Sequence, residues 1–147
     1  MEIIRDMHVS ASTLMNHLVA SLHLEIKQHN IDETNLKSGL VYTKMMTNKF
    51  GQGGEVKVTI VTLTDEEYTA KFETTQGTNQ LSYLIEPIDD HHCRLVYREE
   101  FETHQKMSSL NYKLMSTLFN RRNKKRVNAL LLNIDNYLVQ KQEEANV

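Results

Sequence analysis

The residues whose types could do chemistry lie in one short stretch, DDHHC, residues 89–93. Aspartate, histidine and cysteine are common metal ligands, and a thiol beside a histidine can act as a nucleophile with its base. Neighbouring side chains of an extended chain point to opposite sides, so His91 and His92 could share a metal only through a turn. Alternatively, the aspartates form a hairpin turn and Cys93 begins the next strand. We favour the turn, and expect no metal site and no cofactor.

The carboxylate of Glu99 is a second candidate, because the alternation after Cys93 places it on an apolar face. The two faces of this strand carry Leu95, Tyr97, Glu99 and Phe101 on one side, and Val96, Arg98, Glu100 and Glu102 on the other. A buried carboxylate must find a cation or hydrogen bonds, or stay protonated. Glu99 is therefore a catalytic candidate that could orient a ligand or move a proton. The alternative, a salt bridge at a cavity rim or a strand end facing water, is favoured because nothing in the sequence sets its depth.

Alternating side chains on the other strands could line a pocket together with this face. Apolar walls with a few tyrosine hydroxyls and a lysine are the usual composition of a small-molecule site. A filled core would use the same residues, so both interpretations stay open. The candidate cavity residues are Tyr42, Lys44, Met46, Tyr68, Phe72, Tyr83, Tyr97, Glu99, Phe101 and Leu131.

The strongest local charge signal is RRNKKR, residues 121–126. Such a run could bind RNA or an acidic protein surface. On a helical wheel, however, these cations avoid the apolar stripe that follows them, as a solvated face does. No aromatic residues are interleaved with them for base stacking. We favour the solvated face and expect no nucleic-acid binding, with an RNA- or protein-interaction module as the alternative.

The apolar spacing predicts which elements position these residues. Period four indicates helix and period two indicates strand, and short links between strands imply an antiparallel meander. We expect a strand over 2–9, a helix over 13–29, a short helix between Asp32 and Gly39, strands over 40–47, 55–64, 67–75, 79–88 and 93–103, and a helix over 105–143.

The last helix carries two apolar stripes that do not share a side. Leu110, Leu114, Met115 and Leu118 form the first stripe, and Val127, Leu130, Leu131, Ile134 and Leu138 form the second. On a straight helix the stripes are on the order of 180° apart, and the helix would be roughly 55 Å long in a domain whose radius of gyration is ~15 Å. The sequence therefore predicts a break or bend near Asn120–Asn123. The alternative is a continuous helix whose residues 107–119 form a homodimer surface.

Length and composition limit the class of protein. The chain has 147 residues, a net charge of -2, and 39% hydrophobic and 24% charged residues. These fractions are typical of a globular protein, and no run approaches the ~20 apolar residues of a membrane span. Cys93 is the single cysteine, which excludes an internal disulfide and agrees with a cytoplasmic location. We expect one domain over residues 1–147.

This order of elements resembles the helix-grip fold of the START-like, or SRPBCC, superfamily typified by the Bet v 1 allergens. The segments LKSGLVYTK (36–44), LSYLIEPID (81–89) and CRLVYREEF (93–101) resemble a small bacterial branch described as a domain of unknown function. The resemblance covers nearly the whole chain and implies an α+β fold, in which a curved antiparallel sheet wraps around a long C-terminal helix. It also implies a cavity between them for a small apolar or amphipathic ligand. Some relatives are cyclases, so a cyclase-like or hydrolytic acid/base enzyme using Glu99 is the alternative.

Overall fold

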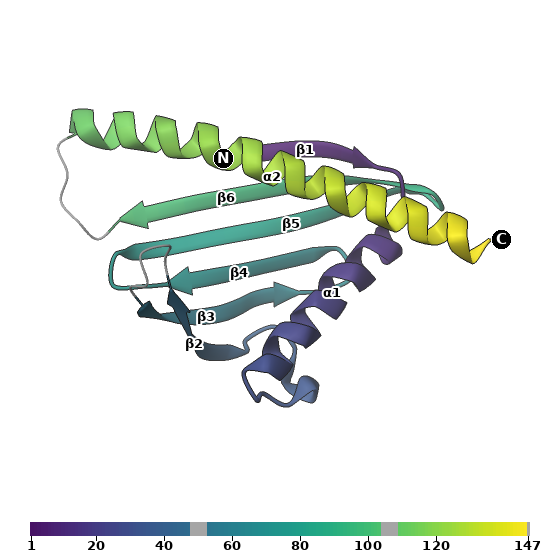
Figure 1. The fold of residues 1–147 in the computed structure, drawn as a ribbon, viewed down its shortest axis with the longest axis horizontal. Helices are drawn as coiled ribbons and strands as arrows, with labels where there is room; N and C mark the ends of the chain where they lie inside the picture. Colours follow the sequence, from purple (N-terminus) through teal and green to yellow (C-terminus); the bar gives the residue numbers. More distant parts are fainter. Residues whose placement is uncertain (48–52, 104–108, 147) are drawn as a thin grey trace.

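The computed structural model describes residues 1–47, 53–103 and 109–146, with the backbone alone over 109–120. Its elements follow the predicted order and confirm the α+β class. They are β1 (Glu2–Met7), α1 (Ala11–Gln28), the short 3₁₀ helix η1 (Glu33–Asn35), β2 (Val41–Thr47), β3 (Gly53–Leu63), β4 (Glu67–Glu73), β5 (Gly77–Asp89), β6 (His92–Thr103) and α2 (Ser109–Ala145). Figure 1 shows one curved sheet with α2 along the long axis of the molecule and α1 crossing it at an angle. Among the described residues, no helix has an apolar stretch long enough to cross a membrane.

The sheet is antiparallel throughout, in the order β1-β6-β5-β4-β3-β2. Its register aligns the predicted faces of neighbouring strands, with Tyr97 opposite Tyr83 and Tyr83 opposite Tyr68. In the next row Glu99 lies opposite Leu81. The alternation seen in single strands therefore becomes one continuous face, the face that the helices cover.

The helix α1 has the signals that its sequence predicts. Ser10 is its N-cap, and the Ser10 hydroxyl accepts a hydrogen bond of 3.2 Å from the Thr13 backbone N–H. The helix ends before Asn30, which adopts the left-handed conformation at φ 58°. Its buried side chains, Leu14, Met15, Leu18, Leu22 and Ile26, recur at helical spacing and pack onto the sheet.

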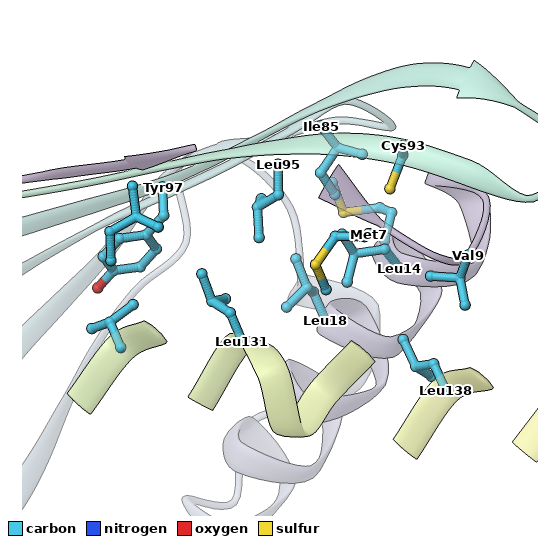
Figure 2. Close-up of a cluster of buried hydrophobic side chains, with 13 residues drawn as sticks. Met7, Val9, Leu14, Leu18, Ile85, Cys93, Leu95, Tyr97, Leu131 and Leu138 are labelled. Atoms are coloured by element: carbon cyan, nitrogen blue, oxygen red, sulfur yellow. The ribbon is translucent and has the colours of Figure 1, made fainter. Parts of the chain in front are cut away.

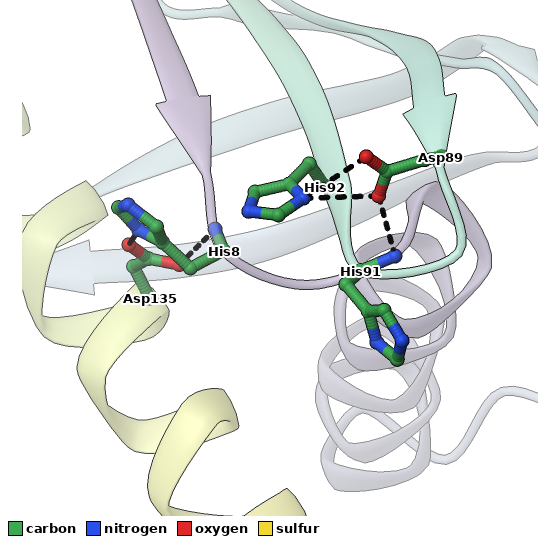
Figure 3. Close-up of polar contacts among 5 residues, drawn as sticks. All are labelled: His8, Asp89, His91, His92 and Asp135. Atoms are coloured by element: carbon green, nitrogen blue, oxygen red, sulfur yellow. Dashed lines mark hydrogen bonds and ion pairs between the residues drawn. The ribbon is translucent and has the colours of Figure 1, made fainter.

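The DDHHC stretch is a turn, as predicted. Asp89 pairs with His92 across the β5–β6 hairpin, and the ladder shifts register between Pro87 and Asp89, where a proline is tolerated. The Asp89 carboxylate accepts a 2.8 Å hydrogen bond from the His91 backbone N–H and lies 2.9 Å from His92 Nδ1 (Figure 3). These contacts, the backbone one first, lower the pKa of Asp89. His91 lies in the turn, and His92 is the first residue of β6.

The C-terminal helix is not broken near Asn120–Asn123, so that prediction is wrong. The helix α2 runs without interruption over 37 residues. The size argument failed because the molecule is elongated: β5 and β6 have 13 and 12 residues, and α2 lies along this long direction (Figure 1). The side chains of residues 107–119, the predicted homodimer surface, lie outside the described part of the chain.

The main hydrophobic cluster joins both helices to β1, β5 and β6. Met7, Leu14 and Leu18 point toward Leu131 and Leu138 of α2 (Figure 2). A polar contact between His8 and Asp135 lies at the end of β1 (Figure 3). The buried Asp135 carboxylate accepts a 2.8 Å hydrogen bond from the His8 backbone N–H, and its other oxygen lies 2.6 Å from His8 Nδ1. This contact connects α2 to the β1–α1 connection.

Cys93 lies in this cluster with no exposed surface, and burial, with a further contribution from the charge of Asp135, raises its pKa to about 11. At pH 8 the thiol is therefore protonated and shielded. We expect iodoacetamide to modify it at least ~100-fold more slowly than in urea-unfolded protein, where the thiolate is accessible. Mass spectrometry of timed samples measures both rates. Equal rates in native and unfolded protein would contradict this placement of Cys93.

Candidate functional site

A pocket of about 400 Å³ lies between the covered face of the sheet and α2. Its walls are mostly hydrophobic, with Met46, Val56, Phe72 and Leu81 from the sheet and Val127 and Leu130 from α2. It lies beside the hydrophobic cluster and shares Tyr97 and Val127 with it. In Figure 2 the phenolic oxygen of Tyr97 points away from Leu95 and Met7. Tyr97 therefore stands at the boundary between the filled and the hollow parts of the interior.

Glu99 forms the polar part of this pocket. It is only 7% exposed, and three hydrogen bonds from neutral groups reach its carboxylate. Asn79 Nδ2 donates to Oε1 at 2.9 Å, while the Tyr97 hydroxyl and Asn123 Nδ2 donate to Oε2 at 2.7 and 2.6 Å. The favoured interpretation of Glu99, a rim salt bridge or a strand end facing water, is therefore wrong. Strand alternation predicted which face of the sheet Glu99 lies on. Glu99 is buried because α2 covers that face.

The surrounding groups hold Tyr97 and Tyr83 in their protonated forms. Burial raises the pKa of Tyr83 to about 12, with a further contribution from the charge of Glu99 and an opposing one from Arg126. Burial also raises the pKa of Tyr97, as do its hydrogen bond to Glu99 and the charge of that carboxylate. The two rings meet edge to face, with their centroids 5.0 Å apart. Tyr97 is therefore a fixed hydrogen-bond donor to Glu99 at neutral pH.

Asn123 is held in turn by Arg126, one turn further along α2. Arg126 Nη2 and Nε donate to Asn123 Oδ1 at 2.6 and 3.2 Å. This contact fixes the orientation of the Asn123 amide, because its oxygen is occupied and its nitrogen faces Glu99. A chain of contacts thus runs from an exposed guanidinium to the buried carboxylate.

Lys44 is a second polar group of the pocket, and it is paired. Its ammonium forms an ion pair with Glu25 of α1 and lies 5.8 Å from the centroid of the Phe72 ring. The Tyr42 hydroxyl donates to the other Glu25 oxygen at 2.9 Å. Burial raises the pKa of Glu25, but the hydrogen bonds from Lys44 and Tyr42 outweigh it, and the pKa is lowered.

Comparison with known sequences identifies the family. A sequence profile described as "Domain of unknown function (DUF3284)" matches residues 1–120. The chain belongs to this family. Among curated proteins, none matches the sequence. The match ends before Asn123 and Arg126, so the profile includes Glu99 but not the α2 residues that reach toward it.

Solved structures show that this DUF3284 chain has the Bet v 1-like, START-like helix-grip fold. The allergen Ara h 8.0201 superposes with a TM-score of 0.62 at 12% identity, over 95% of this chain and 97% of that chain. A norcoclaurine synthase point mutant from Thalictrum flavum, in complex with a transition-state analogue, gives 0.59 at 10% identity over 97% and 94%. A START superfamily protein from Mycobacterium smegmatis gives 0.50 at 8% identity over 91% and 97%. These identities establish the fold alone.

The structure brings seven of the ten predicted cavity residues of this DUF3284 protein to the pocket. They are Lys44, Met46, Phe72, Tyr83, Tyr97, Glu99 and Phe101. The other three, Tyr42, Tyr68 and Leu131, do not line it and are buried in hydrophobic clusters. Leu22 and Ile26 of α1 pack in the clusters of Tyr68 and Tyr42, and Leu131 packs in the main cluster.

Sequence reasoning missed Asn79, Asn123 and Arg126. Asn79 alternates with Leu81 and Tyr83, so strand periodicity alone places it on the pocket face. Asn123 precedes Val127 by one helical turn and therefore belongs to the apolar stripe. Nothing in the sequence distinguishes Arg126 from the four other cations of its run. All five are exposed. The predicted solvated face of residues 121–126 is confirmed for the charged side chains, with Asn123 buried among them.

The Glu25 contacts predict a pH dependence of stability. Because the folded-state pKa of Glu25 is lowered from 4.5, its stabilising contribution is present above about pH 4.5 and is lost as the pH falls through the folded value. We expect Glu25→Gln to reduce the free energy of unfolding by up to ~1 kcal/mol at pH 7, since the site is partly solvated, and by less at pH 3. Urea unfolding at both pH values measures this.

Glu73→Gln is the matched control, because the Glu73 carboxylate also forms ion pairs with lysines but lies at the surface. Its oxygens are 3.8 Å from Lys57 Nζ and 3.9 Å from Lys71 Nζ. We expect it to change stability by less than ~0.5 kcal/mol at either pH. The same loss from Glu25→Gln at pH 3 as at pH 7 would contradict the ion-pair account.

Proposed function

We propose that this protein binds a small apolar or amphipathic molecule in the pocket between the sheet and α2. The observation that carries the proposal is an apolar-walled space of about 400 Å³ with a buried, hydrogen-bonded carboxylate on one side. Small-molecule sites are of this size and composition, with apolar walls and few fixed polar groups. A filled core would leave no such volume beside Glu99.

The structural neighbours support this proposal through the fold that they share with this chain. The norcoclaurine synthase was solved with a transition-state analogue, so this architecture accommodates a small organic molecule in that protein. The free, buried thiol of Cys93 is compatible with a reducing compartment, and we propose that the protein acts in the cytoplasm.

A second candidate function is acid/base catalysis by Glu99, in a cyclase-like or hydrolytic reaction. Its specific support is the position of the Glu99 carboxylate beside the pocket, within hydrogen-bond distance of Tyr97. General acid/base catalysis needs such a group within reach of a bound molecule. Binding needs only the contacts already described, whereas turnover also requires Glu99 to exchange a proton. The binding function is therefore the one that the geometry supports best.

A substitution at the pocket wall tests the binding function. Leu130 lines the pocket but is 47% exposed, so a larger side chain there can occupy the pocket without disturbing the core. We expect Leu130→Trp to weaken binding of 2-methoxynaphthalene, an uncharged apolar probe, at least ~tenfold in calorimetric titrations, a difference of about 1.4 kcal/mol.

The control is Leu132→Trp, two residues further along α2, where leucine is 43% exposed and does not line the pocket. It should leave the affinity unchanged, and both variants should keep the thermal midpoint of the wild type. Equal losses of affinity in the two variants would refute the proposed pocket.

A further inference from the structure

We infer that the ligand carries a hydrogen-bond donor directed to Glu99 Oε1 and Asn79 Oδ1, an amine donating to both of these acceptors or a hydroxyl to one of them. This inference rests on the proposed binding function and specifies the chemical class of the ligand. It follows from the hydrogen bonds that the described residues make and from the acceptors that they leave open.

The Asn79 amide has a fixed orientation and one unpaired oxygen. Its Nδ2 donates to Glu99 Oε1 at 2.9 Å, which fixes the orientation of the amide, because the opposite orientation would set two acceptor oxygens against each other. Asn79 Oδ1 is then an acceptor shielded from solvent, with no hydrogen-bond partner. Nearly all buried polar atoms in proteins are paired, so such an atom requires an explanation.

Glu99 provides a second acceptor next to the first. A carboxylate offers about four acceptor positions, two on each oxygen. Oε2 already accepts from Tyr97 and Asn123, whereas Oε1 accepts only from Asn79. One position therefore remains on Oε1, beside the unpaired oxygen of Asn79. An amine can donate to both acceptors and a hydroxyl to one of them, whereas a carbonyl or an ether has no hydrogen to donate.

The charges of the pocket favour the same class of ligand. Lys44 is paired with Glu25, and Arg126 directs Nε and Nη2 to Asn123 Oδ1. The donors that surround the Glu99 carboxylate are neutral amides and a phenol. A ligand carboxylate at this position would face a like charge at short range, which is unfavourable in a poorly solvated site.

Access requires a small local change. Asn79 lines the pocket, but its oxygen is covered in this conformation, so one neighbouring side chain must shift before a ligand reaches it. Phe72 and Phe101 are the cross-strand neighbours of Asn79, and Phe101 is exposed. We expect one of these two side chains to change its rotamer when a ligand binds, without movement of the strands.

The test compares ligands that share one ring system and differ in a single group. Calorimetric titration of the wild-type protein with 2-naphthol and with 2-methoxynaphthalene should give at least ~tenfold tighter binding of the naphthol, because only it has a donor. The anion 2-naphthoate should bind more weakly than either. Equal affinities for the first two, as expected if only water fills the site, or tightest binding of 2-naphthoate, would overturn the inference.

The variant Glu99→Gln should abolish this selectivity. A glutamine can still accept from Tyr97 and Asn123 through its oxygen, while its nitrogen donates to Asn79 Oδ1 once the Asn79 amide has turned over. The pocket then presents the Asn79 N–H groups, and we expect the ratio of the two affinities to fall to ~twofold or less. Leu130→Ala is the control, because it should weaken both ligands together and preserve their ratio. A ratio that survives in Glu99→Gln would contradict the assignment.

These outcomes separate the inference from the proposed function. If both ligands bind with equal affinity, the pocket binds small molecules but the donor preference is wrong. If neither ligand binds, the proposed function fails and the inference fails with it.

Discussion

The buried Glu99 carboxylate joins two strands of the sheet to α2 through its hydrogen bonds. A charge removed from water needs hydrogen bonds, because an unpaired buried carboxylate costs several kcal/mol. Here the donors come from three elements: Asn79 from β5, Tyr97 from β6 itself and Asn123 from α2. The carboxylate therefore holds α2 at a defined position over the sheet.

This constraint divides the interior into two parts. Toward the β5–β6 turn, α1 and α2 both cover the sheet, and Met7, Leu14 and Leu138 fill the space between them (Figure 2). Toward the opposite ends of these strands α1 is absent, and α2 alone faces the sheet beside Glu99 (Figure 1). One helix cannot fill the width of a six-stranded sheet. The same fold thus provides a rigid, packed half and a pocket whose polar group is already oriented.

Most of the fold could be predicted because the chain changes period clearly, from four over α1 to two over β2–β6 and back to helical spacing over α2. The order of the elements and the identity of the DDHHC turn followed from this pattern. The continuity of α2 did not, since it depends on the elongated shape of the sheet, which no local pattern records. The two apolar stripes of α2 lie on different sides of the helix, and a continuous helix can carry both.

The site could be predicted in part, because strand alternation identifies a face but not the depth of a residue on it. It placed Glu99 with Tyr97 and Phe101, yet it could not show that Asn123, which precedes an apolar stripe within a basic run, approaches that carboxylate from another element. It also could not show that α1 fills the face near Tyr42 and Tyr68. Depth and filling are properties of the packed helices, and they decide which residues form the pocket.

The interior is hollow beside Glu99 and filled around Leu14 and Leu138, and nuclear Overhauser effects between bound 2-naphthol and the protein methyl groups distinguish these two regions. We expect contacts from the naphthol ring to the methyl groups of Val127 and Leu130, and none to those of Leu14 and Leu138. Contacts to Leu14 and Leu138 without contacts to Val127 and Leu130 would place the ligand in the part described as filled and contradict the account.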